Sequence, residues 1–375
     1  MLKGVSLHIM MGVASPSPAP AELVEALVSA QVTQATERRS GFTLSFAFGK
    51  NSLVREKFRQ GFFDPPQRVV LTAMVSGNPM VLMDGVITRH EIAAANDPGA
   101  SRLQITGEDL SRLLDAVDLS WVMKYPAMPA EARVALILAK YLPLGITPIV
   151  LPSVNVDVPL PTEYIPSHMG TDLEYVTYLA KSVGYVFYID PGPLPGQSIA
   201  YWGPEIKTGP SQTTLFVNSD AMSNVDSISF SFDGFSKTLF VFLLHDERLP
   251  VNIPIPIPVP DVNPLSPPLG PRAPLPLRAE PLTGMAKFSL PQALMVGLGK
   301  AARAAETITA SGSLDVLRLG RVLRPRQLVT VAGAGMPHDG LHYVRSVTHE
   351  LRPGEYKQRF TLSRNAFEPW SGLAA

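Results

Sequence analysis

The spacing of apolar and polar residues predicts β-strands through most of the first third of the chain. Residues 41–48 alternate large apolar with small side chains, which is the period-2 pattern of a half-buried strand. Pairs drawn from Asn, Asp, Pro and Gly then interrupt the apolar runs, as turns between strands do. Further strands are therefore expected at residues 68–75, 81–92 and 102–106.

Capping residues predict helices between the strands. Thr171 and Glu174 have the spacing of a capping box, in which each side chain accepts a hydrogen bond from a free backbone N–H. A helix over residues 172–182 is expected to follow, and Gly184 is expected to end it. Three other helices are expected, at residues 108–117 with Thr106 as the cap, 129–141, and 289–306 with Ser289 as the cap.

A proline-rich segment divides the remaining strand patterns. Isoleucine or valine alternates with proline from residue 253 to 260. Because proline lacks an N–H and has a fixed φ, residues 250–281 are expected to form an extended polyproline II strap. Two roles remain open for it: a plain linker, or a strap laid across a neighbour. Strands are expected before it at 185–188, 199–201, 214–217, 225–232 and 237–244, and after it at 307–310, 328–331, 341–351 and 356–362.

Two distant segments share the same order of residues. The spacing from the arginine to the histidine is nearly equal in both, which predicts that residues 68–106 and 326–362 fold as the same β-unit. Two similar units in one chain would suit a quasi-symmetric ring. The first segment has Arg68, Thr72, Asp84-Gly85, His90-Glu91 and Pro98-Gly99, and the second has Arg326, Thr330, Asp339-Gly340, His349-Glu350 and Pro353-Gly354.

The composition disfavours several classes of function. Lys+Arg and Asp+Glu are 32 each, so a net charge of zero offers no general attraction to nucleic acid or to an anionic membrane. The chain has no cysteine, which excludes disulfides, thiol nucleophiles and cysteine-ligated metals. No apolar run approaches the ~18 residues of a membrane-spanning helix. The apolar stretch after Lys3 fits a first strand better than a secretory signal.

Sequence motifs for catalysis or metal binding are incomplete. Residues 297–300 lack the first glycine and the Ser/Thr of a P-loop, and glycines inside a predicted helix are better explained by close packing against a neighbour. His90 has no second histidine at the spacing of a zinc protease motif, and His342 and His349 have opposite parity along one strand. No G-x-S-x-G elbow occurs. We therefore assign no catalytic, cofactor-binding or metal-ligating residue and expect no cofactor.

Two charged clusters have structural explanations. Glu108 and Asp109 could serve a lysozyme-like site, but they fit better as first-turn residues of a helix. A group of arginines lacks the interleaved aromatics of a nucleic-acid surface, so we expect a solvated loop or a protein-contact face there. These are Arg318, Arg321, Arg324 and Arg326.

Four stretches together resemble the baseplate hub proteins of contractile phage tails, a family that includes the late-control-D proteins and the hub region of type VI secretion spike proteins. The resemblance covers most of the chain. The stretches are residues 103–110, residues 170–188, Tyr201-Trp202-Gly203-Pro204, and residues 320–365 with Gly320-Arg321-Val322-Leu323 at their start.

The resemblance implies an α+β, mainly β fold with two related β-barrel units per chain. Three chains would then place six units around a channel. The implied domains are residues 1–118 as the first barrel unit, completed by strands from 199–246; residues 119–245 as a mixed α/β middle region; residues 246–285 as the proline-rich strap; and residues 286–375 as the second barrel unit.

The expected function is a structural baseplate hub that adapts a hexameric tail tube to a trimeric spike. Its implied partners are two more copies of itself, tail-tube initiator proteins, a separate spike chain and baseplate wedge proteins, first in the bacterial cytoplasm and then in the particle. We expect no enzyme activity, no sequence-specific nucleic acid and no membrane insertion. The alternatives are a tail-associated cell-wall hydrolase and, disfavoured by the zero net charge, a nucleic-acid binder.

Overall fold

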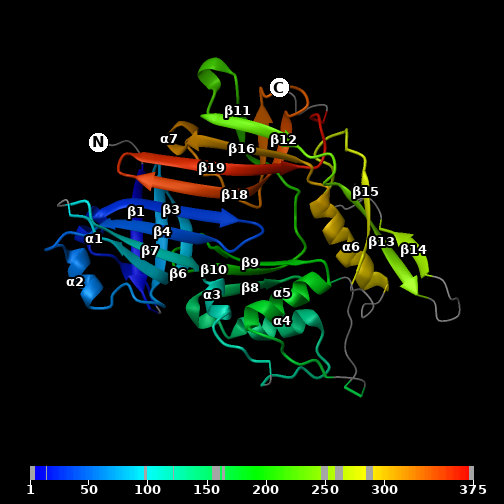
Figure 1. The fold of residues 1–375 in the computed structure, drawn as a ribbon, viewed down its shortest axis with the longest axis horizontal. Helices are drawn as coiled ribbons and strands as arrows, with labels where there is room; N and C mark the ends of the chain where they lie inside the picture. The colour runs from blue at the N-terminus through cyan, green and yellow to red at the C-terminus, as the bar shows by residue number, and fades with distance from the viewer. Residues whose placement is uncertain are drawn as a thin grey trace.

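The computed structural model describes residues 5–13, 15–96, 99–120, 122–153, 161–162, 165–245, 252–257, 265–283 and 290–370. Most strands in these residues join one large, mainly antiparallel sheet that crosses the upper and left parts of Figure 1. Helices α4 (Ala130–Ala139) and α5 (Asp172–Ser182) lie below it with a small sheet. The expected α+β, mainly β class is confirmed.

The N-terminal half of the large sheet has the strand order β3-β4-β7-β6-β5-β1-β2. In β4, Phe42, Leu44 and Phe46 are buried and the residues between them are half-buried, as their alternation predicts. The strand expected after Lys3 is confirmed as β1. The elements are β1 (Val5–Gly12), β2 (Ser17–Pro18), α1 (Ala21–Glu25), β3 (Leu27–Ala35), β4 (Gly41–Ala47), α2 (Leu53–Arg59), β5 (Arg68–Val75), β6 (Asn78–Ala93) and β7 (Arg102–Asp109).

The C-terminal half continues the sheet in the order β18-β19-β16-β12, with β17 beside β18 and β11 beside β17. The prediction that strands from 199–246 complete the first unit is wrong for β11 and β12, because they pair with β17 and β16 of this half. The domain boundaries themselves stay a prediction. The elements are β11 (Ser211–Phe216), β12 (Ser227–Phe232), β16 (Ile308–Asp315), α7 (Val316–Leu319), β17 (Leu328–Ala332), β18 (Gly340–Arg352) and β19 (Glu355–Arg364).

Strands β3 and β18 join the two halves, and we call this junction the seam. They pair in antiparallel register from Ser346 opposite Ala35 to Leu351 opposite Ala30. The hydroxyls of Thr33 and Thr348 lie 3.2 Å apart across it. One hydrophobic core continues from one half into the other. In the described residues no strand pair closes either half into a separate barrel.

The two segments that share a residue order have the same local topology. β5, β6 and β7 form an antiparallel meander, and so do β17, β18 and β19. Asp84-Gly85 lies inside β6, whereas Asp339-Gly340 precedes and starts β18, so this pair does not occupy equivalent positions. The superposition of the two units stays a prediction.

The middle region packs helices on the three-stranded sheet β8-β10-β9, formed by β8 (Ile146–Val150), β9 (Val186–Pro191) and β10 (Ser198–Gly203). The capping box is confirmed: the Thr171 hydroxyl accepts from the Glu174 N–H, and the Glu174 carboxylate accepts from the Thr171 N–H. The predicted α4 is confirmed as well. The helix expected over 108–117 is shortened to α3 (Ser111–Leu114), because β7 extends to Asp109 and includes Thr106.

The proline-rich segment is partly a strand. β14 (Asn252–Pro256) pairs with β13 (Thr238–His245), and β15 (Arg278–Pro281) lies on the other side of β13. Polyproline II is therefore wrong for residues 252–256, because β14 is an edge strand, where proline is tolerated when its nitrogen faces outward. Residues 250–251 and 258–264 lie outside the described residues.

Helix α6 (Leu290–Ala304) confirms the helix that the sequence predicted after the strap, while Ser289 lies outside the described residues. A Cβ on Gly297 would lie 2.7 Å from Ile257, and one on Gly299 would lie 3.1 Å from the Gly184 carbonyl oxygen. The two glycines thus allow close packing, as the sequence predicted. In the described part of the chain, no helix has the length and apolar character to cross a membrane.

Candidate functional site

The carboxylates considered for a lysozyme-like site have structural partners. Glu108 and Asp109 lie on β7, not on a helix as expected. Glu108 pairs with Arg39 at 3.2 Å. Asp109 is buried and accepts from the backbone N–H groups of Ser40 at 2.8 Å and Ser111 at 2.9 Å. Burial raises the pKa of Asp109. These two residues therefore hold the β3–β4 connection and the start of α3.

His342 and His349 occupy separate buried places in the C-terminal half. A bulge between Val344 and Ser346 shifts the alternation along β18, so His342 and His349 fall on the same face and the opposite-face prediction is wrong. The ring of His342 lies 6.0 Å from that of Phe230, whereas His349 bonds with Tyr356. In the residues that the structure describes, no group of His, Asp and Glu has the arrangement of a metal site.

The arginine cluster forms contacts within the chain. Arg318 pairs with Asp226, and Arg321 donates to the Gln212 carbonyl oxygen. The Arg324 backbone N–H donates to the Gln212 side chain. Arg321 and Arg324 thus contact β11, and the expected solvated loop or protein-contact face at this cluster stays a prediction.

A buried polar network fixes the register of the seam. His349 Nδ1 lies 2.9 Å from the Tyr356 hydroxyl, and its Nε2 lies 3.4 Å from Gln34 Oε1. Gln34 also donates to the Leu82 carbonyl oxygen at 2.7 Å, which links β3 to β6. Burial, helped by Arg324, lowers the pKa of His349 to about 3, so the ring is neutral at neutral pH. A register slip would leave these buried groups without partners.

Two arginines attach the middle region to the large sheet. Arg68 on β5 binds Asp84 through two hydrogen bonds of 2.7 and 2.6 Å. It also donates to the carbonyl oxygens of Leu144 and Gly196 in the middle region. Arg326, just before β17, pairs with Asp190 of β9 at 2.8 Å and lies 3.8 Å from the Tyr188 ring centroid. Arg68 starts β5 and Arg326 precedes β17, so the first strand of each repeat-like segment contacts the middle region through an arginine.

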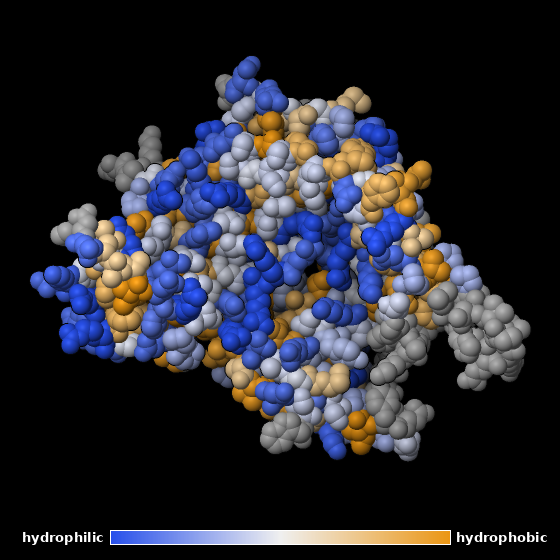
Figure 2. Space-filling model, viewed as in Figure 1, coloured by the Kyte–Doolittle hydropathy of each residue, from blue (hydrophilic) through white to orange (hydrophobic). Residues whose placement is uncertain are grey.

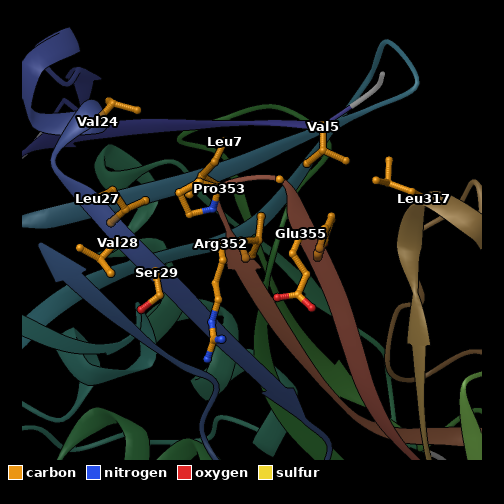
Figure 3. Close-up of a pocket in the computed structure, with 13 residues that line it drawn as sticks. Val5, Leu7, Val24, Leu27, Val28, Ser29, Leu317, Arg352, Pro353 and Glu355 are labelled. Atoms are coloured by element: carbon orange, nitrogen blue, oxygen red, sulfur yellow. The ribbon is translucent and has the colours of Figure 1, made fainter. Parts of the chain in front are cut away.

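An apolar groove opens where the seam ends, with a cavity volume of about 550 Å³. Figure 3 shows its walls coming from β1, β3, the β18–β19 hairpin and the α7 region. Arg352 and Glu355 are its charged members. β3 continues past its last partner on β18, so in the described residues the start of β3 is paired with β4 on one side and has no strand on the side of the groove. Its apolar side chains include Val5, Leu7, Val24, Leu27, Val28 and Leu317.

Large apolar side chains are also exposed at several points of the described surface. The most exposed are Leu275, Phe235, Met336, Val13 and Met222, each at least 64% exposed. Figure 2 shows apolar residues spread around the rim of one face and hydrophilic residues around a central hollow. Single exposed apolar side chains are normal on a folded protein, so the contiguous groove is the stronger candidate for a contact surface.

Comparison with known proteins gives structural relatives and no sequence relatives: no family model matches the chain. No curated protein matches it either. A 43 kDa tail protein of prophage MuSo2 from Shewanella oneidensis matches with a TM-score of 0.65 and 13% identity, covering 97% of this chain and 100% of that one.

Two further solved structures are similar over nearly the whole chain. A tail protein from Neisseria meningitidis MC58 matches with a TM-score of 0.61 and 14% identity, covering 96% of this chain and 97% of that one. The c3393 protein of E. coli, a component of the type VI secretion system, matches with a TM-score of 0.53 and 11% identity, covering 93% and 75%. The chain therefore has the fold of phage tail proteins and of a type VI secretion component, which agrees with the resemblance read from its sequence.

Proposed function

We propose that this chain is a structural protein of a phage tail or of a related injection particle. The observation that carries the proposal is the match of the whole fold, from end to end, to tail proteins of nearly the same length. The internal contacts of the charged clusters and the exposed apolar surface support a role in assembly over a role in catalysis.

Within that role, we propose that the chain is the baseplate hub. Two meanders of the same topology, one in each of the two sheet halves that the seam joins, are what one chain needs to fill two similar positions of a ring. Three chains would then provide six positions to a six-fold tube and three to a three-fold spike. Large obligate interfaces would hold the ring together.

The proposed partners follow from that geometry. Two more copies of the chain complete the ring, tail-tube initiator proteins contact its six-fold side, a separate spike chain contacts its three-fold side, and wedge proteins surround it. The chain would assemble in the bacterial cytoplasm and then reside in the baseplate.

Deletion of the gene in the producing bacterium tests the role. We expect tubes without baseplates, or no particles, in electron micrographs, and complete particles after complementation. Normal particles with a normal baseplate would contradict the proposal. Release of soluble fragments from purified peptidoglycan by the isolated protein would instead favour the cell-wall hydrolase.

A further inference from the structure

Strand β12 is the last strand at one end of the large sheet and lies toward the top of Figure 1. One of its edges pairs with β16 in antiparallel register, from Ser227 opposite Ser313 to Phe232 opposite Ile308. In the described residues its other edge has no neighbouring strand, and we call it the open edge. An unpaired edge presents a row of backbone N–H and C=O groups that can template another strand.

The register shows which backbone groups face the open edge. The Asp233 N–H, one residue beyond β12, donates to the Thr307 carbonyl oxygen at 2.9 Å. Because successive residues of an antiparallel pair face opposite edges, Ile228, Phe230 and Phe232 direct their N–H and C=O groups away from β16. Among the residues that the structure describes, no other segment hydrogen-bonds to these groups. The open edge therefore offers donors and acceptors in the spacing of a strand.

Three other edge strands are protected against such pairing. β2 has only two residues, and β14 contains Pro254 and Pro256, which have no N–H to donate. The edge of β11 is occupied by the Asn224 side chain, which accepts from the Phe216 N–H at 2.9 Å and donates to the Thr214 carbonyl oxygen at 3.0 Å. β12 has six residues without a proline, a charged side chain or a bulge in its register. Since proteins protect or cover their sheet edges, we expect another chain to cover this one.

The side chains of β12 indicate the kind of strand that would fit. Ile228 and Phe230 pack on the hydrophobic core and are half-buried, and Phe232 is 49% exposed. On the opposite face, Ser229 and Ser231 are exposed. Cross-strand neighbours on one face lie about 5 Å apart, so an added strand would cover the apolar side chains with its own. The fitting strand thus alternates apolar and small polar residues.

Acidic residues flank β12 at both ends. Asp226 pairs with Arg318 at 3.1 Å. Asp233 accepts from the Phe235 N–H at 2.9 Å and has no ion pair in the described part of the chain, so its charge is not neutralised there. If two copies paired antiparallel along the whole of β12, Asp226 of each copy would lie opposite Asp233 of the other, and like charges in that position are destabilising. The charges therefore favour a different chain with a basic residue at the end of its strand.

We propose that the open edge of β12 binds an extended segment of a different chain, which adds a strand to the large sheet. The segment alternates apolar and small polar residues and ends in Lys or Arg beside Asp233. Backbone hydrogen bonds supply the attachment, and the side chains select the partner. This inference goes beyond the structural role proposed above and does not depend on it, because peptide binding is measured on the isolated protein.

The test is fluorescence anisotropy of the purified full chain with a fluorescein-labelled ten-residue peptide that has Lys at both ends and alternating Thr and Val between them. We expect saturable binding, together with slower hydrogen exchange in β12 and unchanged exchange in β11. The control peptide has the same sequence with N-methyl groups on two adjacent central amides, which removes a donor from each of its edges. It should bind at least tenfold more weakly, because its side chains are intact and its backbone pairing is not.

Substitutions at the open edge test the same hydrogen bonds from the side of the protein. I228P/F232P removes two donors where the proline nitrogen faces away from β16, and it should weaken binding at least tenfold. The matched control I228V/F232V shortens the same side chains, keeps both N–H groups and should stay within threefold of the wild type. Asp233→Asn keeps an oxygen for the Phe235 N–H but loses the charge, so binding should weaken and depend less on salt.

Five results would overturn the proposal: no saturable binding, equal binding of the N-methylated peptide, unchanged hydrogen exchange in β12 at saturation, equal loss in I228P/F232P and I228V/F232V, or unchanged binding in Asp233→Asn. A dimer of the wild type that I228P/F232P dissociates would identify a second copy as the occupant and would also contradict it. If I228P/F232P fails to fold by circular dichroism, the N-methylated peptide tests the same backbone pairing on the wild type.

Discussion

The two arginines that attach the middle region to the large sheet differ in how deeply they and their carboxylate partners are buried. Arg68 and its partner Asp84 have side chains that are 3% and 0% exposed. Arg326 and its partner Asp190 are 12% and 32% exposed. Removing one member of a buried ion pair leaves an uncompensated charge, whereas a partly exposed pair contributes little. The N-terminal half should therefore hold the middle region more firmly than the C-terminal half does.

The histidines differ between the halves in the opposite sense. His8 and His90 of the N-terminal half are exposed or half-buried. His342 and His349 of the C-terminal half are fully buried, and burial lowers the pKa of each to about 3. Acid should therefore destabilise the C-terminal half and the seam.

The largest effect is expected from Arg68→Ala. The substitution leaves Asp84 buried without its cation and removes the hydrogen bonds to Leu144 and Gly196. The free energy of unfolding, measured in urea, should therefore fall by about 3–5 kcal/mol. The double variant R68M/D84L replaces both charges by apolar groups and should be less damaging than the single one. A single variant as stable as the wild type would remove the distinction between the two attachments.

The second-largest loss of stability is expected when the pH is lowered from 6.5 to 5.5. The unfolded histidines have a pKa near 6.5, and the folded His342 and His349 near 3, so stability is complete above pH 6.5 and falls as the pH drops toward 3. Because the unfolded histidines are already half protonated at pH 6.5, each loses about 1 kcal/mol of stabilisation between pH 6.5 and 5.5, or about 2 kcal/mol together. Urea unfolding at the two pH values measures this loss. His349→Gln should halve the slope, and an unchanged slope would show that His349 is not buried as described.

Arg326→Ala should have a smaller effect, about 1–2 kcal/mol, because it removes a partly exposed ion pair, a contact with the Tyr188 ring and a hydrogen bond to the Ala35 carbonyl oxygen. Hydrogen exchange should rise in β9 with little change in β5. Arg326→Lys keeps the charge but loses the planar fork, and should be intermediate. A loss equal to that of Arg68→Ala would contradict the comparison.

The smallest loss of stability is expected from a substitution within the middle region, at Thr171. Thr171→Ala removes the cap of α5 and should cost about 1 kcal/mol, while Thr171→Ser keeps the hydroxyl and should cost less. Thermal unfolding measures both. Since neither arginine contacts Thr171, the loss should add to that of Arg326→Ala, and a strong departure from additivity would show that the attachment and the helix are coupled.

Local patterns predicted the elements that local interactions form. The capping box at Thr171 and the alternation in β4 need only neighbours in sequence, and both are present. Strand β3 was not predicted, because its buried Gln34 is satisfied by a carbonyl oxygen of Leu82, far along the chain. Thr106 was wrongly predicted as a helix cap because a contact with a distant residue decides the local structure here as well. The Asp109 carboxylate accepts a hydrogen bond from the Ser40 N–H, and β7 continues to Asp109.

The candidate surfaces could not be predicted from the sequence, because they form where strands far apart in the chain pair with one another. The groove takes its walls from β1, β3 and the hairpin at Pro353, which the seam brings together. The bulge near Arg345 reversed the predicted facing of His342 and His349, and no residue at that place signals it. What the sequence did contain was the residue order shared by the two meanders and the stretches that resemble hub proteins.

Electron cryo-microscopy of the assembled particle tests the central proposal most directly. We predict three copies of the chain around a central channel, with the β5–β7 and β17–β19 meanders alternating in six similar positions between the tube and the spike. Six copies in the ring, one copy on the axis, or two meanders that do not superpose would contradict it.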